Sequence, residues 1–133
     1  NKGERSQNGG SNGDLFIEIL VSSHKFFKRE GKNIHISIPI SSVDATLGTK
    51  VDVPTVYGDV ELTIPSGTQH GTQFRLRGKG MQDLRTSTVG DQYVQIHIEV
   101  EKKLSKEEKE LYEKLRSISN KESVFDKFKK TFK

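Results

Sequence analysis

Apolar and polar residues alternate along three short stretches in the middle of the chain. The apolar positions are Val51 and Val53, then Val60, Leu62 and Ile64, then Phe74 and Leu76. A period of two places each apolar set on one face of a β-sheet and each polar set on the other. Turn signals separate the stretches at Tyr57-Gly58, Pro65-Ser66-Gly67 and Gly78-Lys79-Gly80. The region from Gly48 to Gly80 is therefore predicted to be a β-meander joined by hairpins.

The same alternation predicts three strands outside this region, at Asp14–Val21, Asn33–Ile40 and Gln92–Val100. Pro39 has no amide hydrogen, so it belongs at a sheet edge or a strand end, and we expect Asn33–Ile40 to be an edge strand. Residues 42–48 predict a short helix that is capped by Ser42 and ends at Gly48. Residues 81–89 are predicted to form a polar loop.

From Leu104 onward the spacing of apolar residues becomes helical. Ser105 and Glu108 fit a capping box, in which each side chain binds a free backbone amide at the helix start. The residues at helical spacing are Leu111, Tyr112, Leu115 and Ile118, and then Val124, Phe125, Phe128 and Phe132. Two short amphipathic helices are predicted, and helices this short need a packing partner. We expect a second copy of the chain as that partner, with purely internal packing as the alternative.

The length of 133 residues suits one domain of ordinary size, and no apolar run approaches the length of a membrane span. The absence of cysteine excludes disulfides, thiolate zinc sites and a cysteine nucleophile, and it fits a reducing compartment. The first residues, 1–6, hold no signal-peptide core and no initiator methionine. A processed product or an excised piece is therefore expected.

No group of residues supports catalysis. The four histidines, His24, His35, His70 and His97, lack the spacing of metal ligands, and His35 and His97 alternate with inward residues, which indicates an outer sheet face. The glycine-rich segment 78–80 does not continue into the G-x-G-x-x-G motif of dinucleotide-binding proteins. The chain also contains no P-loop motif and no nucleophile elbow. We therefore predict that the chain is not an enzyme and holds no cofactor.

A net charge of +4 admits one alternative function, the binding of nucleic acid by a basic β-module. Basic residues surround Phe26 and Phe27. A second basic group lies along one face of the predicted strand that contains Leu76. The two groups are Lys25, Lys28, Arg29 and Lys32, and Arg75, Arg77 and Lys79. Aromatic rings among cations can stack bases and bind phosphates. Elsewhere acidic and basic residues are interspersed, as on an ordinary mixed surface.

The start of the chain repeats a later segment at an offset of 77 residues. Lys2-Gly3 corresponds to Lys79-Gly80, and Gly13-Asp14 corresponds to Gly90-Asp91, with alternating apolar residues after each Gly-Asp pair. Such an echo is typical of tandem homologous domains. It predicts that residues 1–21 are the end of a preceding homologous β domain, that residues 22–103 form a complete later copy and that residues 104–133 form a helical segment.

These motifs resemble the C-terminal region of the DnaJ family, the J-domain co-chaperones. The resemblance rests on these motifs: Gly13-Asp14-Leu15, His24-x-x-Phe27-x-Arg29-x-Gly31, Ala45-x-Leu47-Gly48, Val53-Pro54-Thr55, Gly58, Ile64-Pro65-Ser66-Gly67-Thr68-Gln69-x-Gly71, Arg75-Leu76-Arg77-Gly78-Lys79-Gly80 and Gly90-Asp91. It implies a mostly β fold, a small two-sheet β-sandwich of the second C-terminal domain, followed by a dimerisation segment. It also implies two tandem β domains, which accounts for the echo.

The resemblance implies a cytoplasmic co-chaperone that binds unfolded polypeptide clients, forms a homodimer and, in the full-length protein, delivers clients to DnaK. The family's J-domain motif His-Pro-Asp and its zinc module with paired Cys-x-x-Cys motifs are absent here, so neither zinc nor ATPase stimulation is expected of this chain. The expected client contacts are Phe26, Phe27, Ile34, Ile36 and Ile38. The expected dimer contacts are the apolar residues of the two C-terminal helices. Contact with a membrane is not expected, and nucleic acid remains the alternative partner.

Overall fold

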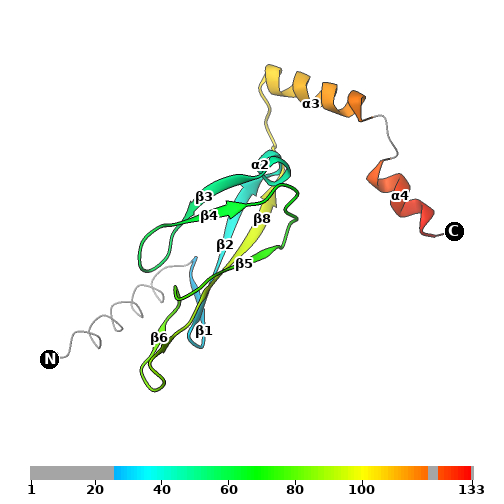
Figure 1. Cartoon of the computed structure of the whole chain (residues 1–133). Helices are drawn as coiled ribbons and strands as arrows, with labels where there is room; N and C mark the ends of the chain where they lie inside the picture. The colour runs from blue at the N-terminus through cyan, green and yellow to red at the C-terminus, as the bar shows by residue number, and fades with distance from the viewer. Residues whose placement is uncertain (1–25, 120–122, 133) are drawn as a thin grey trace. The chain divides into compact units, whose positions relative to one another are not determined.

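The computed structural model describes residues 26–119 and 123–132 (Figure 1). The chain divides into two compact units, Asn1–Val100 and Glu101–Lys133. The predicted strand Asp14–Val21, together with His24 and Lys25, lies outside the described residues, and the assignment of residues 1–21 to a preceding domain stays a prediction.

A four-stranded sheet with the order β1-β2-β8-β5 organises the first unit. Its strands are β1 (Lys28–Glu30), β2 (Asn33–Ser41), β8 (Gln92–Glu99) and β5 (Gln73–Leu76). β2 runs parallel to β8, while β1 and β5 run antiparallel to their neighbours. β2 is therefore not the outermost strand, but β1 covers only its first three residues, so the predicted edge is present from Ile36 to Ser41, where that side of β2 pairs with no other described strand.

Pro39 is tolerated inside β2 because β1 is short. β1 pairs only with the first three residues of β2, Asn33 to His35. Pro39 lies beyond that pairing, near the end of β2, so its missing amide hydrogen interrupts no hydrogen bond with β1. The expectation that Pro39 lies at a sheet edge or a strand end is therefore confirmed for the strand end.

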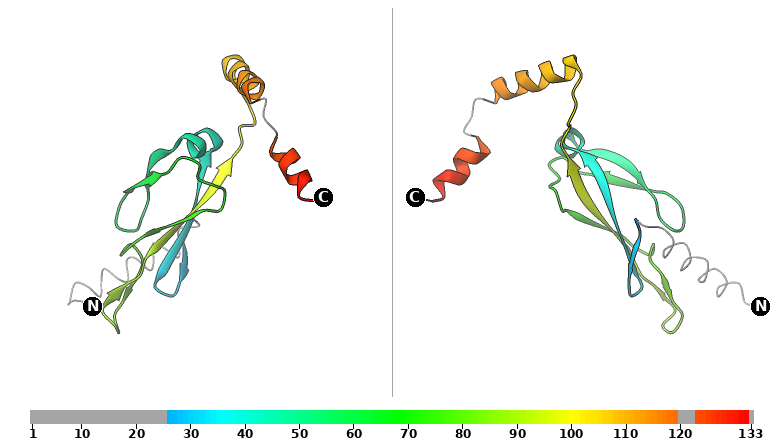
Figure 2. Two further views of the ribbon diagram at one scale, coloured as in Figure 1. Left: turned by 45° about the vertical axis from the view of Figure 1, so that its right-hand side comes forward. Right: turned by 180° about the vertical axis from the view of Figure 1, so that it is seen from behind.

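A β-hairpin of β3 (Thr49–Val53) and β4 (Val60–Ile64) forms a second layer next to the four-stranded sheet (Figure 2). β5 does not continue this hairpin. It pairs with β8, so the predicted three-stranded meander is wrong at its third strand. The β3–β4 hairpin itself is confirmed.

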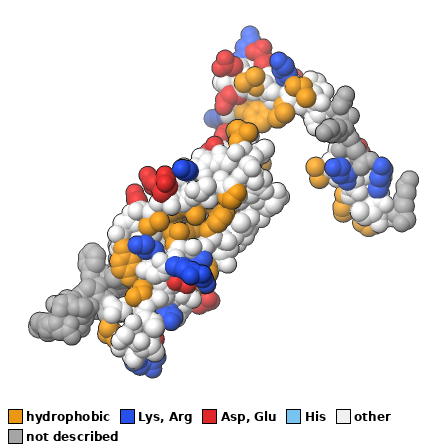
Figure 3. Space-filling view, in the orientation of Figure 1, with side chains coloured by type: hydrophobic (Ala, Val, Ile, Leu, Met, Phe, Trp, Pro, Cys, Tyr) orange, Lys and Arg blue, Asp and Glu red, His pale blue; other side chains and the backbone are white. Residues whose placement is uncertain are grey.

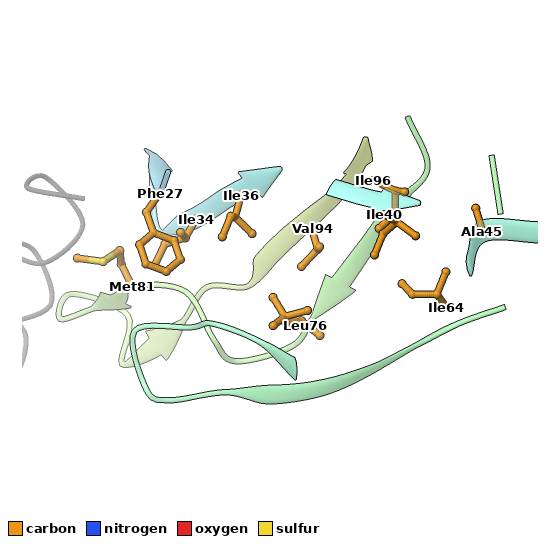
Figure 4. Close-up of a cluster of buried hydrophobic side chains, with 11 residues drawn as sticks. Phe27, Ile34, Ile36, Ile40, Ala45, Ile64, Leu76, Met81, Val94 and Ile96 are labelled. Carbon is orange, nitrogen blue, oxygen red and sulfur yellow. The ribbon is translucent and has the colours of Figure 1, made fainter. Parts of the chain in front are cut away.

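The core lies between the two layers (Figure 4). The alternating apolar residues of β2 and β8 supply one side of it, and the hairpin supplies Val53 and Ile64, each 1% exposed. The remaining buried apolar residues are Phe27, Ile34, Ile36, Ile40, Ala45, Leu76, Met81, Val94 and Ile96. The predicted inward sets are thus confirmed, except that Val100 lies beyond β8 and is 77% exposed.

A third hairpin occupies the predicted loop at 81–89. Its strands are β6 (Gln82–Asp83) and β7 (Thr88–Val89). The amide of Met81 donates to the carbonyl of Lys32 at 2.7 Å, and the amide of Gly80 donates to the carbonyl of Gly90 at 2.9 Å. The first bond fastens the base of the hairpin to the turn between β1 and β2, and the second closes that base.

Helix α2 (Ser42–Leu47) connects β2 to β3 and confirms the predicted helix. Its N-cap is Ser41 and not Ser42, since the Ser41 hydroxyl accepts the amide hydrogen of Asp44 at 3.1 Å. Gly48 ends the helix with φ +88°, as expected of a glycine that can adopt a conformation L side chains avoid.

The second unit contains α3 (Lys106–Ile118) and α4 (Val124–Lys130). The predicted capping box is confirmed in both directions: Glu108 donates its amide to the Ser105 hydroxyl, and Ser105 donates its amide to the Glu108 carboxylate. Among the described residues, no helix has the length and apolar character needed to cross a membrane. Small sheets with a few short helices confirm the predicted, mostly β fold class.

Candidate functional site

The structure places the predicted client contacts in two environments. Ile34, Ile36 and Phe27 are 0%, 6% and 7% exposed, so these side chains belong to the core. Ile38 is half-buried against the same core, whereas Phe26 is 57% exposed. Of the five, Phe26 is the side chain that a partner reaches most readily without opening the sheet.

The outer face of the four-stranded sheet carries polar and aromatic side chains in register. Lys28, His35, Tyr93 and Arg75 occupy one row across all four strands. The His35 ring stacks on the Tyr93 ring with centroids 5.2 Å apart. Arg75 Nε lies 3.7 Å from a carboxylate oxygen of Asp91, so part of the positive charge on this face is balanced. The predicted outward position of His35 is confirmed.

Two further histidines meet where β8 ends. The rings of His70 and His97 lie edge to face with centroids 4.9 Å apart. His70 Nδ1 accepts the amide hydrogen of Ile98 at 3.0 Å, which places the ring proton of neutral His70 on Nε2. Within residues 26–119 and 123–132, no three His, Cys, Asp or Glu side chains gather as a group that could hold a metal ion.

A half-buried apolar surface of the first unit lies along β4 and β5. Each of these strands ends its own sheet, so one edge of each pairs with no other described strand. A strip of hydrophobic side chains runs over this region in the space-filling view (Figure 3). Half-buried apolar residues from the two strands, Val60, Leu62 and Phe74, pack against the core there. We call these three residues the apolar seam.

An unpaired strand edge next to apolar side chains suits one kind of ligand. The edge offers free backbone N–H and C=O groups, which an extended peptide can pair with as an added strand. The apolar side chains beside it can then accept alternate side chains of that peptide. Sequence alternation identified Val60, Leu62 and Phe74 as inward residues but carried no signal that β4 and β5 are edges.

The helices of the second unit present another exposed apolar surface. Seven of the eight predicted dimer contacts are exposed, at 55% for Phe128 up to 86% for Val124, and Tyr112 is half-buried. In α4 the ring of Phe128 contacts that of Phe125 and, at 5.0 Å between centroids, that of Phe132. We call the eight residues, Leu111, Tyr112, Leu115, Ile118, Val124, Phe125, Phe128 and Phe132, the helix stripe.

Comparison with known proteins identifies relatives along the whole chain. The model of the DnaJ C terminal domain family matches residues 1–101. A protein named Chaperone protein DnaJ from Erysipelothrix rhusiopathiae is 62% identical over 133 residues, which cover 99% of this chain and 36% of the relative. Proteins of the same name from Acholeplasma laidlawii and Listeria monocytogenes are 48% and 46% identical, over 98% and 99% of this chain.

The chain therefore spans little more than a third of these relatives, at 36% to 37% of their length. The matched part is their C-terminal part. All three relatives are named as chaperones, which does not favour the alternative of a nucleic-acid-binding module.

Proposed function

This chain belongs to the DnaJ family of chaperones, and we propose that it binds extended segments of unfolded polypeptides and brings two copies of itself together. The observation that supports client binding is the apolar seam, with an unpaired strand edge on either side. Unfolded chains expose the two features that such a surface can bind, namely free backbone groups and apolar side chains.

Binding at the seam would proceed by strand addition. A client segment pairs its backbone with the free edge of β4 or β5 and places alternate apolar side chains against Leu62 and Phe74. Backbone pairing carries no side-chain preference, so the edge can accept many sequences, while the seam selects for apolar character. Phe26, the accessible residue of the predicted client set, would extend the contact on the outer face of the sheet.

Dimerisation through the helix stripe would join two such sites. Burial of an exposed phenylalanine contributes about 1.5–3 kcal/mol, so Phe125 and Phe128 in α4, with Phe132 just after it, provide a substantial driving force. Two weak sites on one dimer bind one client more tightly than either site alone, because the second contact becomes intramolecular.

The delivery of clients to a DnaK-type partner, a cytoplasmic location and any zinc-bearing module are proposals for the whole protein and follow from family membership. The chain itself contains no cysteine with which to build a thiolate zinc site. Its own contribution is the capture of the client.

A pair of substitutions on one strand tests the seam. Leu62→Lys places a charge in the apolar seam, whereas Thr63→Lys adds the same charge to an exposed position on the opposite face of β4. We expect Leu62→Lys to reduce the affinity for a fluorescent apolar peptide about tenfold and to abolish protection of a denatured reporter enzyme from aggregation.

Thr63→Lys should leave both readouts unchanged, and circular dichroism should show that both variants are folded. Equal affinity of the two variants for the peptide would exclude the seam as the client site. The outer face around Phe26 would then be the next surface to test, with Phe26→Ser.

A further inference from the structure

The two strands of the apolar seam, β4 and β5, belong to different sheets. Among the described strands, β4 pairs with β3 and β5 pairs with β8, so no hydrogen-bond ladder sets the distance from Leu62 to Phe74. At one end of the seam the chain itself connects the two strands through residues 65–72. At the other end, beside the loop between β3 and β4, the spacing of the strands depends on tertiary contacts.

A tyrosine in the β3–β4 loop supplies such contacts. The Tyr57 hydroxyl donates to the carbonyl of Gly80 at 2.6 Å, and Gly80 lies between β5 and β6. The ammonium group of Lys79 lies 5.7 Å from the centre of the Tyr57 ring, within the range of a cation–π contact. In Figure 1 the β3–β4 loop points toward the end of the first unit that carries β6. We call the contacts of Tyr57 with Gly80 and Lys79 the clasp.

The loop that carries Tyr57 is closed by its own hydrogen bonds. The amides of Thr55 and Gly58 each donate to the carbonyl of the other residue at 3.1 Å. The Thr55 hydroxyl also donates to the Gly58 carbonyl at 2.6 Å and accepts the amide hydrogen of Tyr57 at 3.0 Å. Gly58 has φ +112°, which L side chains rarely adopt, so this turn requires glycine. The backbone of Tyr57 is therefore ordered before any ligand binds.

A buried glutamine connects the same loop to the four-stranded sheet. Gln92 is 0% exposed on the inner face of β8, and its side-chain amide donates to the carbonyl of Pro54 at 2.9 Å. Pro54 directly follows β3. The loop is thus bonded to β8 through Gln92 and to the chain after β5 through Tyr57, so the hairpin layer is held against the sheet at this end.

From these contacts we infer that Tyr57 is a positioning residue for client binding, which sets the width of the apolar seam. With the clasp closed, Leu62 and Phe74 are held at the spacing at which one extended apolar segment contacts both. A surface that is already ordered loses little conformational entropy when it binds, so the closed clasp raises the affinity for the client. This role of Tyr57 rests on the proposed function, because it belongs to the same site.

The width of the seam can be measured without a client. The chain contains no cysteine, so a pair of spin labels can be attached at Asp59→Cys and Arg77→Cys, two exposed positions close in sequence to Tyr57 and Gly80. Double electron–electron resonance then gives the distribution of distances between the labels. Tyr57→Phe keeps the ring that Lys79 contacts but removes the hydroxyl donor, and we expect the distribution to broaden toward longer distances.

The effect on client binding is measured with the fluorescent apolar peptide and the whole chain without labels. Loss of the hydroxyl donor in Tyr57→Phe should lower the affinity about threefold to tenfold. The matched control is Tyr93→Phe, which removes the same hydroxyl on the outer face of the sheet and should change neither the affinity nor the label distances. A purely structural role of Tyr57 would lower the urea midpoint of unfolding but leave the affinity of the folded chain unchanged.

Two results would overturn the role of Tyr57. They are an unchanged distance distribution in Tyr57→Phe, and a broadened distribution without loss of affinity for the peptide. The client proposal fails in a different way, through equal peptide affinities of Leu62→Lys and Thr63→Lys, and that result would remove the role of Tyr57 as well. An affinity that falls in Leu62→Lys but not in Tyr57→Phe leaves the client site standing and excludes only the positioning role.

Discussion

At the scale of single residues, close backbone packing explains two glycines that no turn requires. Gly80 and Gly90 lie where the β6–β7 hairpin crosses the β1–β2 turn. A Cβ atom on Gly80 would lie 2.5 Å from the carbonyl oxygen of Lys32, and one on Gly90 would come still closer to the same atom. Neither contact involves only a flexible side chain, so the backbone itself would have to move.

Gly90→Ala should therefore destabilise the first unit by more than about 2 kcal/mol, measured by urea unfolding. The matched control is Gly71→Ala. Gly71 has φ +87° and open space around its Cα, so alanine there costs only the strain of a left-handed conformation, about 1–2 kcal/mol. A smaller loss of stability for Gly90→Ala than for Gly71→Ala would contradict this account of the crossing.

At the scale of elements, the predictions that depend on residues close together in the sequence are confirmed. The capping box of α3, the glycine stop of α2 and the alternation of β2 and β8 all depend on residues within a few positions of each other, and all are confirmed. The N-cap of α2 differs by one residue because two adjacent serines satisfy the same preference, and only the backbone path selects Ser41.

The capping box makes α3 sensitive to acid. The backbone amide and hydroxyl of Ser105 lower the pKa of Glu108 below its ordinary value of 4.5. A lowered pKa in the folded state means that the ionised carboxylate stabilises the helix above pH 4.5, and that this contribution is lost as the pH falls through the folded-state pKa. We expect the Cα chemical shifts of the first turn of α3 to move toward coil values over that range.

Glu108→Gln should remove this pH dependence, because glutamine can still bind the Ser105 amide but does not ionise. Ser105→Ala should lower the helical content of α3 at neutral pH. An unchanged acid transition in Glu108→Gln would assign the effect to other carboxylates of the helix.

At the scale of the whole molecule, the two units differ in how they satisfy their apolar residues. The first unit buries a core of apolar residues between two layers, whereas α3 and α4 contain no buried residue. Short helices with an exposed apolar face are marginal without a partner. This contrast is the physical basis for the proposal that the second unit dimerises.

Removal of the residues after Lys103 should convert a dimer into a folded monomer in sedimentation equilibrium. In the whole chain, Phe128→Ser should weaken the dimer, and Lys127→Ser, a change of a polar neighbour in the same helix, should not. Phe128 is 55% exposed in the chain alone, so its replacement removes little intramolecular packing. A truncated chain that remains dimeric would move the interface to the first unit.

The sequence by itself determined the longer strands and the helices, the inward side chains of those strands, and the family, but it missed β1 and the β6–β7 hairpin. Each of these follows from a period, a cap or a motif that is complete within a short stretch. Alternation also identified His35 as outward and Ile34 as inward, which the structure confirms.

Only the tertiary structure decided which strands are neighbours, and therefore where the edges lie. A period of two gives a strand its inner and outer faces but no information about the partner at either edge, since backbone hydrogen bonds are the same for every sequence. Long-range packing placed β2 between β1 and β8, and it left β4 and β5 with free edges. The apolar seam depends on which edges of β4 and β5 stay unpaired, so it is not visible before the chain is folded.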